Sequence, residues 1–198
     1  GNKLLLGFSD ISVLLGTIYQ RCGLVTIHGP TLAQIPELSP GAQEHLHRLL
    51  RGELPSELVF QPLVFLVPGR AQGPLLGGNL TTLTHLVGTP YALQLRGHIL
   101  FLEDHNEALY RLDRLLQQLK LAGSLEGLAG LVLGAFTNCG EPARLWELFA
   151  DLGRALGIPV AAGLPCGHQP DNYALPLGAE AVLESTTQSL KLFLWPGP

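Results

Sequence analysis

The sequence predicts an α/β fold, on the evidence of two alternating patterns and of its composition. Short apolar runs bounded by Gly and Pro, such as 97–102 and 128–136, are typical of buried strands. Between them, stretches such as 107–121 carry apolar residues every three or four positions, which is the spacing of an amphipathic helix. Hydrophobic residues make up 46% of the chain and charged residues 14%, so a sizeable core can be buried. Strands that alternate with helices indicate a largely parallel sheet.

The expected elements begin with a strand and a helix that are joined by a very short turn. The apolar run Leu4–Leu6 predicts a buried strand, and helical spacing follows over 10–21. Further strands are expected at 24–28, 58–67, 97–102, 128–136 and 158–164, and further helices at 42–50, 81–87, 107–121 and 143–156. Residues 69–74 are expected to form a turn, and residues 181–194 an antiparallel hairpin.

Composition excludes several classes of protein. The formal net charge of −4 gives no basic surface for nucleic acid. Apolar runs are far shorter than the roughly 20 residues that span a bilayer. The three cysteines, Cys22, Cys139 and Cys166, are odd in number and widely scattered, which argues against a disulfide framework and fits a reducing compartment. We therefore expect a cytoplasmic protein that binds neither nucleic acid nor a membrane.

The turn around Ser9 is the first candidate site. Gly7, Phe8 and Ser9 leave three residues in which a strand gives way to a helix, so the Ser9 hydroxyl would project from the sheet near free backbone N–H groups. That is the logic of a nucleophile elbow, although Ile11 stands where the usual second glycine would be. The alternative is that Ser9 or Asp10 simply caps the helix.

Other reactive side chains follow the ends of the expected strands, where ligands bind in open α/β sheets. They are His28, Glu103, Asp104, His105, Thr137, Asn138, Cys139, Cys166 and His168. A nucleophilic serine needs a histidine to take its proton and a carboxylate to orient that histidine. Both kinds of residue are available at this edge of the sheet.

Each of these residues also has a simpler explanation. His28 precedes Gly-Pro and is interpreted as a turn or core histidine. Cys166 and His168 could ligate a metal, but two ligands without a second pair are a weak zinc signal. Residues 77–79 (Gly-Gly-Asn) could cradle a phosphate, yet they match neither dinucleotide-binding nor P-loop patterns.

Seven motifs in order, spread over essentially the whole chain, resemble the LD-carboxypeptidase family. They are Gly7-Phe-Ser-Asp-Ile-Ser12, Ile27-His-Gly-Pro30, Gly77-Gly-Asn-Leu80, Gly88-Thr-Pro-Tyr91, Ile99-Leu-Phe-Leu-Glu-Asp104, Gly134-Ala-Phe-Thr137 and Gly167-His168. The family comprises serine peptidases that remove the terminal D-alanine from murein tetrapeptides, together with relatives that give immunity to microcin C. The resemblance implies a Ser-Glu-His triad of Ser9, Glu103 and His168, with the Asp10 N–H in the oxyanion hole. It also implies a role in peptidoglycan recycling, a homodimer, and the use of no metal or cofactor.

The expected domain organisation combines the pattern and the resemblance. Residues 1–38 would be the remnant of a parallel-sheet nucleophile domain, 39–57 a linker with a solvated helix, and 58–198 an α/β carboxy-terminal domain that supplies acid and base. The family has roughly a hundred residues before its serine, the size of a small domain, which hold most of the amino-terminal sheet. We therefore expect the chain to be the later part of a longer protein, with an exposed apolar strand at 4–6.

The resemblance leaves the substrate open. A murein tetrapeptide would need a cation near the carboxylate of its leaving D-alanine, for which Arg70 and Arg96 are candidates. A microcin-type substrate would need an aromatic ring such as Trp146 or Tyr173 to stack on adenine. Two alternatives remain: an ordinary α/β-hydrolase esterase, which the absent elbow glycine disfavours, and a non-catalytic relative that binds peptide.

Overall fold

The computed structural model describes residues 4–194. Residues 1–3 and 195–198, the outer ends of the two expected domains, lie outside the described part. Within these residues lie five α-helices: α1 Ser12–Cys22, α2 Pro40–Leu50, α3 Leu80–Thr84, α4 Leu109–Leu121 and α5 Pro142–Leu156. Two short 3-10 helices are η1, Ser9–Ile11, and η2, Leu32–Glu37. The strands are β1 Leu6–Gly7, β2 Thr26–His28, β3 Glu57–Phe60, β4 Val64–Val67, β5 Arg70–Asn79, β6 Ile99–His105, β7 Gly130–Thr137, β8 Val160–Ala162, β9 Leu175–Leu177, β10 Glu180–Glu184 and β11 Ser189–Phe193.

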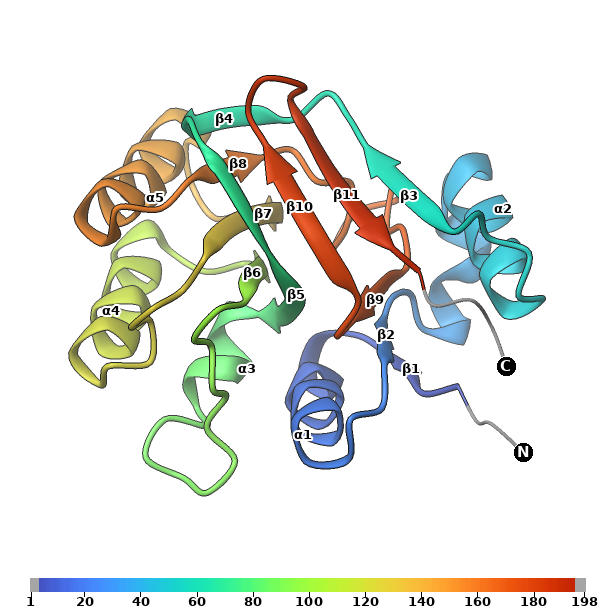
Figure 1. The fold of residues 1–198 in the computed structure, drawn as a ribbon, viewed down its shortest axis with the longest axis horizontal. Coiled ribbons are helices and arrows are strands. Elements are labelled where there is room, and N and C mark those ends of the chain that lie inside the picture. Colours follow the sequence, from blue (N-terminus) through green and yellow to red (C-terminus); the bar gives the residue numbers. More distant parts are fainter. Residues whose placement is uncertain (1–3, 195–198) are drawn as a thin grey trace.

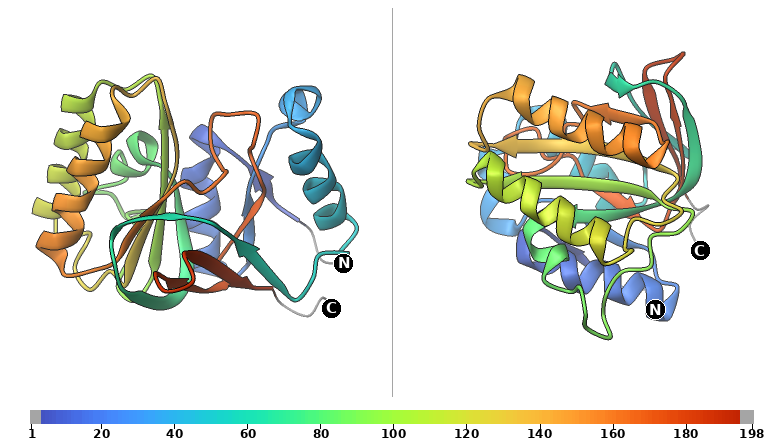
Figure 2. Two further views of the ribbon diagram at one scale, coloured as in Figure 1. Left: turned by 90° about the horizontal axis from the view of Figure 1, so that it is seen from above. Right: turned by 90° about the vertical axis from the view of Figure 1, so that its left-hand side faces the viewer.

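The larger sheet has eight strands in the order β3-β11-β10-β5-β6-β7-β8-β4 (Figure 1). β5 to β8 are parallel, and α4 and α5 lie side by side along one face of them (Figure 2). β10, β11, β3 and β4 pair in the antiparallel sense. The hairpin of β10 and β11 is as expected, because a tight connection can join only antiparallel strands. The expectation of a largely parallel sheet is met by β5 to β8; apart from the expected hairpin, it was wrong for β3 and β4, which pair in the antiparallel sense.

A smaller sheet carries the turn at Ser9. Its order is β1-β2-β9, with β1 parallel and β9 antiparallel to β2. β9 comes from residues 175–177, so a late segment of the chain completes the sheet that begins at residue 6. α1 packs against both β2 and β5 and thus joins the two sheets. The elbow and the ends of β5 to β7 are thereby brought together.

Three local expectations were wrong. Residues 70–74 belong to β5, where Gly73 allows the carbonyl of Gly97 to come close, since a Cβ on Gly73 would lie 2.0 Å from that oxygen. The strand begins only at Leu6, and Leu4 and Leu5 are 51% and 37% exposed, which contradicts the expected buried strand at 4–6 and agrees with the apolar exposure also expected there. The helix expected to be solvated, α2, instead buries Ala42 and Leu46 in a second apolar cluster with Ile27, Leu38 and Ala174. The domain boundaries at 38/39 and 57/58 stay a prediction.

Candidate active site

The chain reverses at Ser9 by adopting a strained backbone. Phe8 is extended, with a φ of −156°, whereas Ser9 has a φ of 57°, in the left-handed region that non-glycine residues rarely occupy. Such strain is found preferentially at functional sites. The turn is tight enough that a Cβ on Gly7 would lie 2.3 Å from Cγ2 of Ile11. Ile11, which stands where a nucleophile elbow usually has its second glycine, fits here because Gly7 has no side chain.

Glu103 and His168 form a hydrogen-bonded pair. The Nδ1 of His168 lies 2.7 Å from Oε2 of Glu103, which is fully buried, while the His168 side chain is 20% exposed. Glu103 sits at an irregularity in the pairing of β6 with β7, between Leu102 and Asp104. Such bulges re-aim side chains beside active sites. With Nδ1 directed at the carboxylate, the second ring nitrogen, Nε2, is left for a reaction partner.

Asp104 faces the other way. Its Oδ1 accepts from Asn79 Nδ2 and from the His105 N–H, and its Oδ2 accepts from the N–H and hydroxyl of Thr81. Successive side chains of a strand point to opposite faces, so only one of the two adjacent acids can reach the imidazole. The structure pairs Glu103 with His168 and uses Asp104 to bind the first turn of α3.

The loop that carries His168 is fixed by two hydrogen bonds and lies close to Glu103 at Gly167. The Thr137 hydroxyl donates to the His168 carbonyl at 2.6 Å, and the Gly167 N–H donates to Oδ1 of the buried Asn172 at 2.9 Å. Gly167 has a φ of 116°, and a Cβ there would lie 3.0 Å from both Cβ and Oε2 of Glu103. The glycine thus lets the loop lie directly on the carboxylate. Asn172 was missed in the sequence, where nothing distinguishes it from other loop amides.

Aromatic rings connect the elbow to His168. The ring of Phe8, the residue before Ser9, lies 4.3 Å from the His168 ring. The His105 ring also stacks on the His168 ring, at 4.8 Å and with an interplanar angle of 9°. Behind Phe8 lies His28, at 5.6 Å. The importance of Phe8 had no signal in the sequence, because its contacts join distant segments.

His28 is a buried core histidine, as its position before Gly-Pro suggested. It is 0% exposed, and neither ring nitrogen has a hydrogen-bond partner among residues 4–194. Desolvation lowers the pKa of His28 to about 3, with the charge of His168 as a smaller cause. The His28 ring is therefore neutral in the folded protein near neutral pH.

The other motifs serve packing. A Cβ on Gly78 would lie 2.4 Å from Oγ of Ser12, and that Oγ accepts from the Asn79 N–H, so residues 77–79 join β5 to α1. The Cys166 thiol donates to the Tyr173 carbonyl at 3.1 Å, and burial raises its pKa well above the ordinary value. Within residues 4–194, no group of three His, Cys, Asp or Glu side chains is placed to hold a metal ion.

The residues considered for substrate contacts lie elsewhere. Arg70 begins β5, whereas Asn79 at its other end is paired with Glu103. Asn79 follows Arg70 by nine residues, so the two residues lie about 30 Å apart along the strand. Arg96 precedes β6 and lies 3.7 Å from Glu126, also away from the carboxyl ends of the strands. Tyr173 packs against His45 and Phe60.

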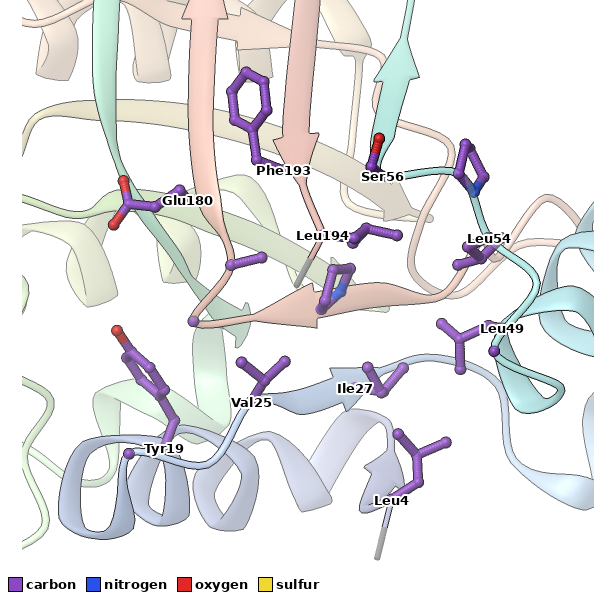
Figure 3. Close-up of a pocket in the computed structure, with 16 residues that line it drawn as sticks. Leu4, Tyr19, Val25, Ile27, Leu49, Leu54, Ser56, Glu180, Phe193 and Leu194 are labelled. Carbon is purple, nitrogen blue, oxygen red and sulfur yellow. The ribbon is translucent and has the colours of Figure 1, made fainter. Parts of the chain in front are cut away.

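Two cavities differ in their relation to these residues. A cleft of about 280 Å³ is lined by His168 and by Gln34, Glu37, Leu38, Gln169 and Pro170. A larger cavity of about 610 Å³ lies between β2, β9 and the end of α2, with Val25, Ile27, Leu49 and Leu54 around it (Figure 3). None of the predicted site residues lines the larger cavity. Of the predicted triad, His168 lines the smaller cleft. Among residues 4–194, no helix is long and apolar enough to cross a membrane.

Comparison with known proteins matches this arrangement to one family. The model of the LD-carboxypeptidase C-terminal domain matches residues 72–183, and that of the N-terminal domain matches residues 1–29. A murein tetrapeptide carboxypeptidase of Pseudomonas aeruginosa is 40% identical over 91% of this chain and 62% of its own length. The crystal structure of a muramoyltetrapeptide carboxypeptidase from Oxalobacter formigenes superposes with a TM-score of 0.84 at 32% identity, over 98% of this chain and 70% of that one.

A second group of similar structures is represented by the microcin C7 self-immunity protein MccF. The apo structure of its inactive mutant has a TM-score of 0.85 at 25% identity, over 98% of this chain and 68% of that one. The chain spans about three fifths of the length of the curated relatives that it matches, 61% for one from Bacillus subtilis.

Proposed function

The chain belongs to the LD-carboxypeptidase family, and on that premise we propose that it contributes a Ser9-Glu103-His168 triad to a serine-type LD-carboxypeptidase. The observation that carries the proposal is the buried Glu103–His168 hydrogen bond of 2.7 Å, packed through Phe8 against the strained turn at Ser9. An orienting carboxylate, a histidine and a serine on a sharp turn are the components that acyl transfer needs.

In the proposed reaction, Nε2 of His168 accepts the proton of the Ser9 hydroxyl as Oγ attacks the carbonyl carbon of the scissile amide. The tetrahedral intermediate collapses, the C–N bond breaks, and the leaving amine takes the proton from His168. A water molecule then attacks the acyl-enzyme, and His168 serves again as base and then as acid to regenerate Ser9. Glu103, which accepts from Nδ1, holds the required tautomer and stabilises the imidazolium.

The oxyanion would be stabilised in part by the Asp10 N–H. Asp10 follows the serine and lies in the first turn of η1, where backbone N–H groups have no intrahelical partner. Preorganised donors of this kind contribute about 3–4 kcal/mol to the stabilisation of such a transition state. We propose no metal or cofactor in the reaction.

We propose the bond before the terminal D-alanine of a murein tetrapeptide as the substrate, because relatives named for that activity are 32–40% identical to this chain. The cleft beside His168 is the surface where the peptide would bind. We further propose that the protein is a cytoplasmic homodimer that acts in peptidoglycan recycling and binds neither nucleic acid nor a membrane. The alternative, supported by the similarity to MccF, is a hydrolase that inactivates a microcin C-type aminoacyl nucleotide.

The experiment offers the protein two substrates side by side, a murein tetrapeptide and an aminoacyl-sulfamoyl adenylate, with Ser9→Ala as the control. Release of D-alanine by the parent protein and not by the variant supports the proposal. Turnover of the adenylate alone would favour the alternative. If a folded protein binds the tetrapeptide but cleaves neither compound, the chain is a peptide-binding relative and not an enzyme.

A further inference from the structure

We propose that His105 is a positioning residue that holds the imidazole ring of His168 in its reactive orientation by stacking on it. The inference rests on the proposed function for its catalytic consequence, but the contact itself is independent of it. The two rings lie 4.8 Å apart and within 9° of parallel. Phe8 lies on His168 at 4.3 Å and is tilted by 46°, so the imidazole has one aromatic neighbour from β6 and another from the turn after β1.

A second contact is needed because one hydrogen bond fixes only one point of the ring. The bond from Nδ1 to Glu103 does not by itself prevent the ring from tilting about that contact. A tilt of some tens of degrees would move Nε2 by about 1 Å, and a misplacement of that size costs about 100-fold in rate. A flat ring stacked in parallel opposes such a tilt, because offset-stacked aromatic pairs attract each other beyond the effect of the area they bury.

The backbone of His105 is itself held in place. Its N–H donates to Oδ1 of Asp104 at 2.8 Å, and it is paired with Thr137 in the register of β6 and β7. Thr137 in turn donates its hydroxyl to the His168 carbonyl. One cross-strand pair, His105 and Thr137, therefore contacts His168 twice, at the ring and at the backbone.

Phe8 gives the arrangement its link to the nucleophile. It directly precedes Ser9, and its ring is supported from behind by His28, which contacts Phe101 at 4.9 Å. The five rings form a continuous series, which we call the aromatic column: Phe101, His28, Phe8, His168 and His105. His105 closes this column at its partly exposed end. It is thus the member that can be changed with the least damage to the core.

The test compares His105→Ala with His105→Phe, which removes the imidazole but keeps a flat ring. We expect His105→Ala to lower kcat for D-alanine release about 10- to 100-fold and to leave KM within about twofold, because the ring acts on His168 and not on the substrate. We expect His105→Phe to keep kcat within about threefold of the parent. Equal losses in the two variants, or an unchanged kcat in His105→Ala, would overturn the proposal.

A second measurement separates this proposal from the proposed function. The proton on Nδ1 of His168, bonded to Glu103, is expected to give a far-downfield proton resonance, absent from His168→Ala. His105→Ala should shift or broaden this signal, and His105→Phe should restore it. If it responds in this way while the protein hydrolyses nothing, the positioning role stands and the proposed function fails. A signal unchanged in His105→Ala would refute the positioning role whatever the activity.

Discussion

Replacing the buried His28 by phenylalanine should make the protein less sensitive to acid. His28 is 0% exposed, its ring nitrogens lack partners among residues 4–194, and burial lowers its pKa to about 3. In the unfolded chain a histidine has a pKa of about 6.5. Between these values the unfolded chain binds one more proton than the folded protein does. The free energy of unfolding therefore falls as the pH falls, by about 1.4 kcal/mol per unit from this residue.

The magnitude follows from the two pKa values. From pH 6.5 to pH 4.5 the His28 contribution to the free energy of unfolding should fall by about 2 kcal/mol. His28→Phe removes the titrating group but keeps a ring against Phe8 and Phe101, which both contact His28 edge to face. The parent protein should therefore lose about 2 kcal/mol more than the variant over this interval.

The assay is urea unfolding at pH 6.5 and 4.5, with His47→Phe as the matched control. His47 lies on α2 and is exposed, so its substitution should leave the pH dependence of the parent protein unchanged. If His28→Phe and the parent lose the same stability between the two pH values, His28 is not held neutral in the folded protein, and the reasoning fails.

Three further predictions concern the site and the edge of the small sheet. Glu103→Gln should lower kcat by about 10³-fold or more, whereas Asp104→Asn should lower the melting temperature and keep kcat within about tenfold. If kinetics and thermal melts give the reverse pattern, Asp104 is the carboxylate that orients the histidine and Glu103 the structural one. Gly167→Ala should lower kcat at least about tenfold, because its Cβ displaces the Glu103 carboxylate, and a fully active, folded variant would contradict this. Amides of residues 4–8 should exchange rapidly with deuterium, since β1 pairs on one side alone in the described sheet; slow exchange there would count against it.

Elements with strong periodicity were predictable. α4 and α5 were expected within two residues of their observed starts and at their observed ends, because each buries one regular stripe on the large sheet. The hairpin at 181–194 was also recognised from local pattern. Gly73 and Pro74 led to the wrong expectation of a turn, because a glycine marks a close backbone approach as readily as a turn. Which of the two it marks depends on a strand from another part of the chain.

The candidate site was likewise predictable from the sequence only in part. The elbow was predictable because strand, turn and helix are contiguous at Ser9. The alternation of side chains along a strand allows only one of Glu103 and Asp104 to reach His168. The contacts of Phe8 and His105 with His168 could not be derived, since they join three distant segments through tertiary packing. The choice of Glu103 and His168 themselves came from resemblance to the family.

The most direct test of the central claim is covalent labelling with a serine-directed phosphonate, followed by peptide mass spectrometry. We expect one adduct, on Ser9, with none in Ser9→Ala and much slower labelling in His168→Ala, because the serine depends on its base. Labelling at another serine, or no labelling of a folded protein that still releases D-alanine from the tetrapeptide, would contradict the account.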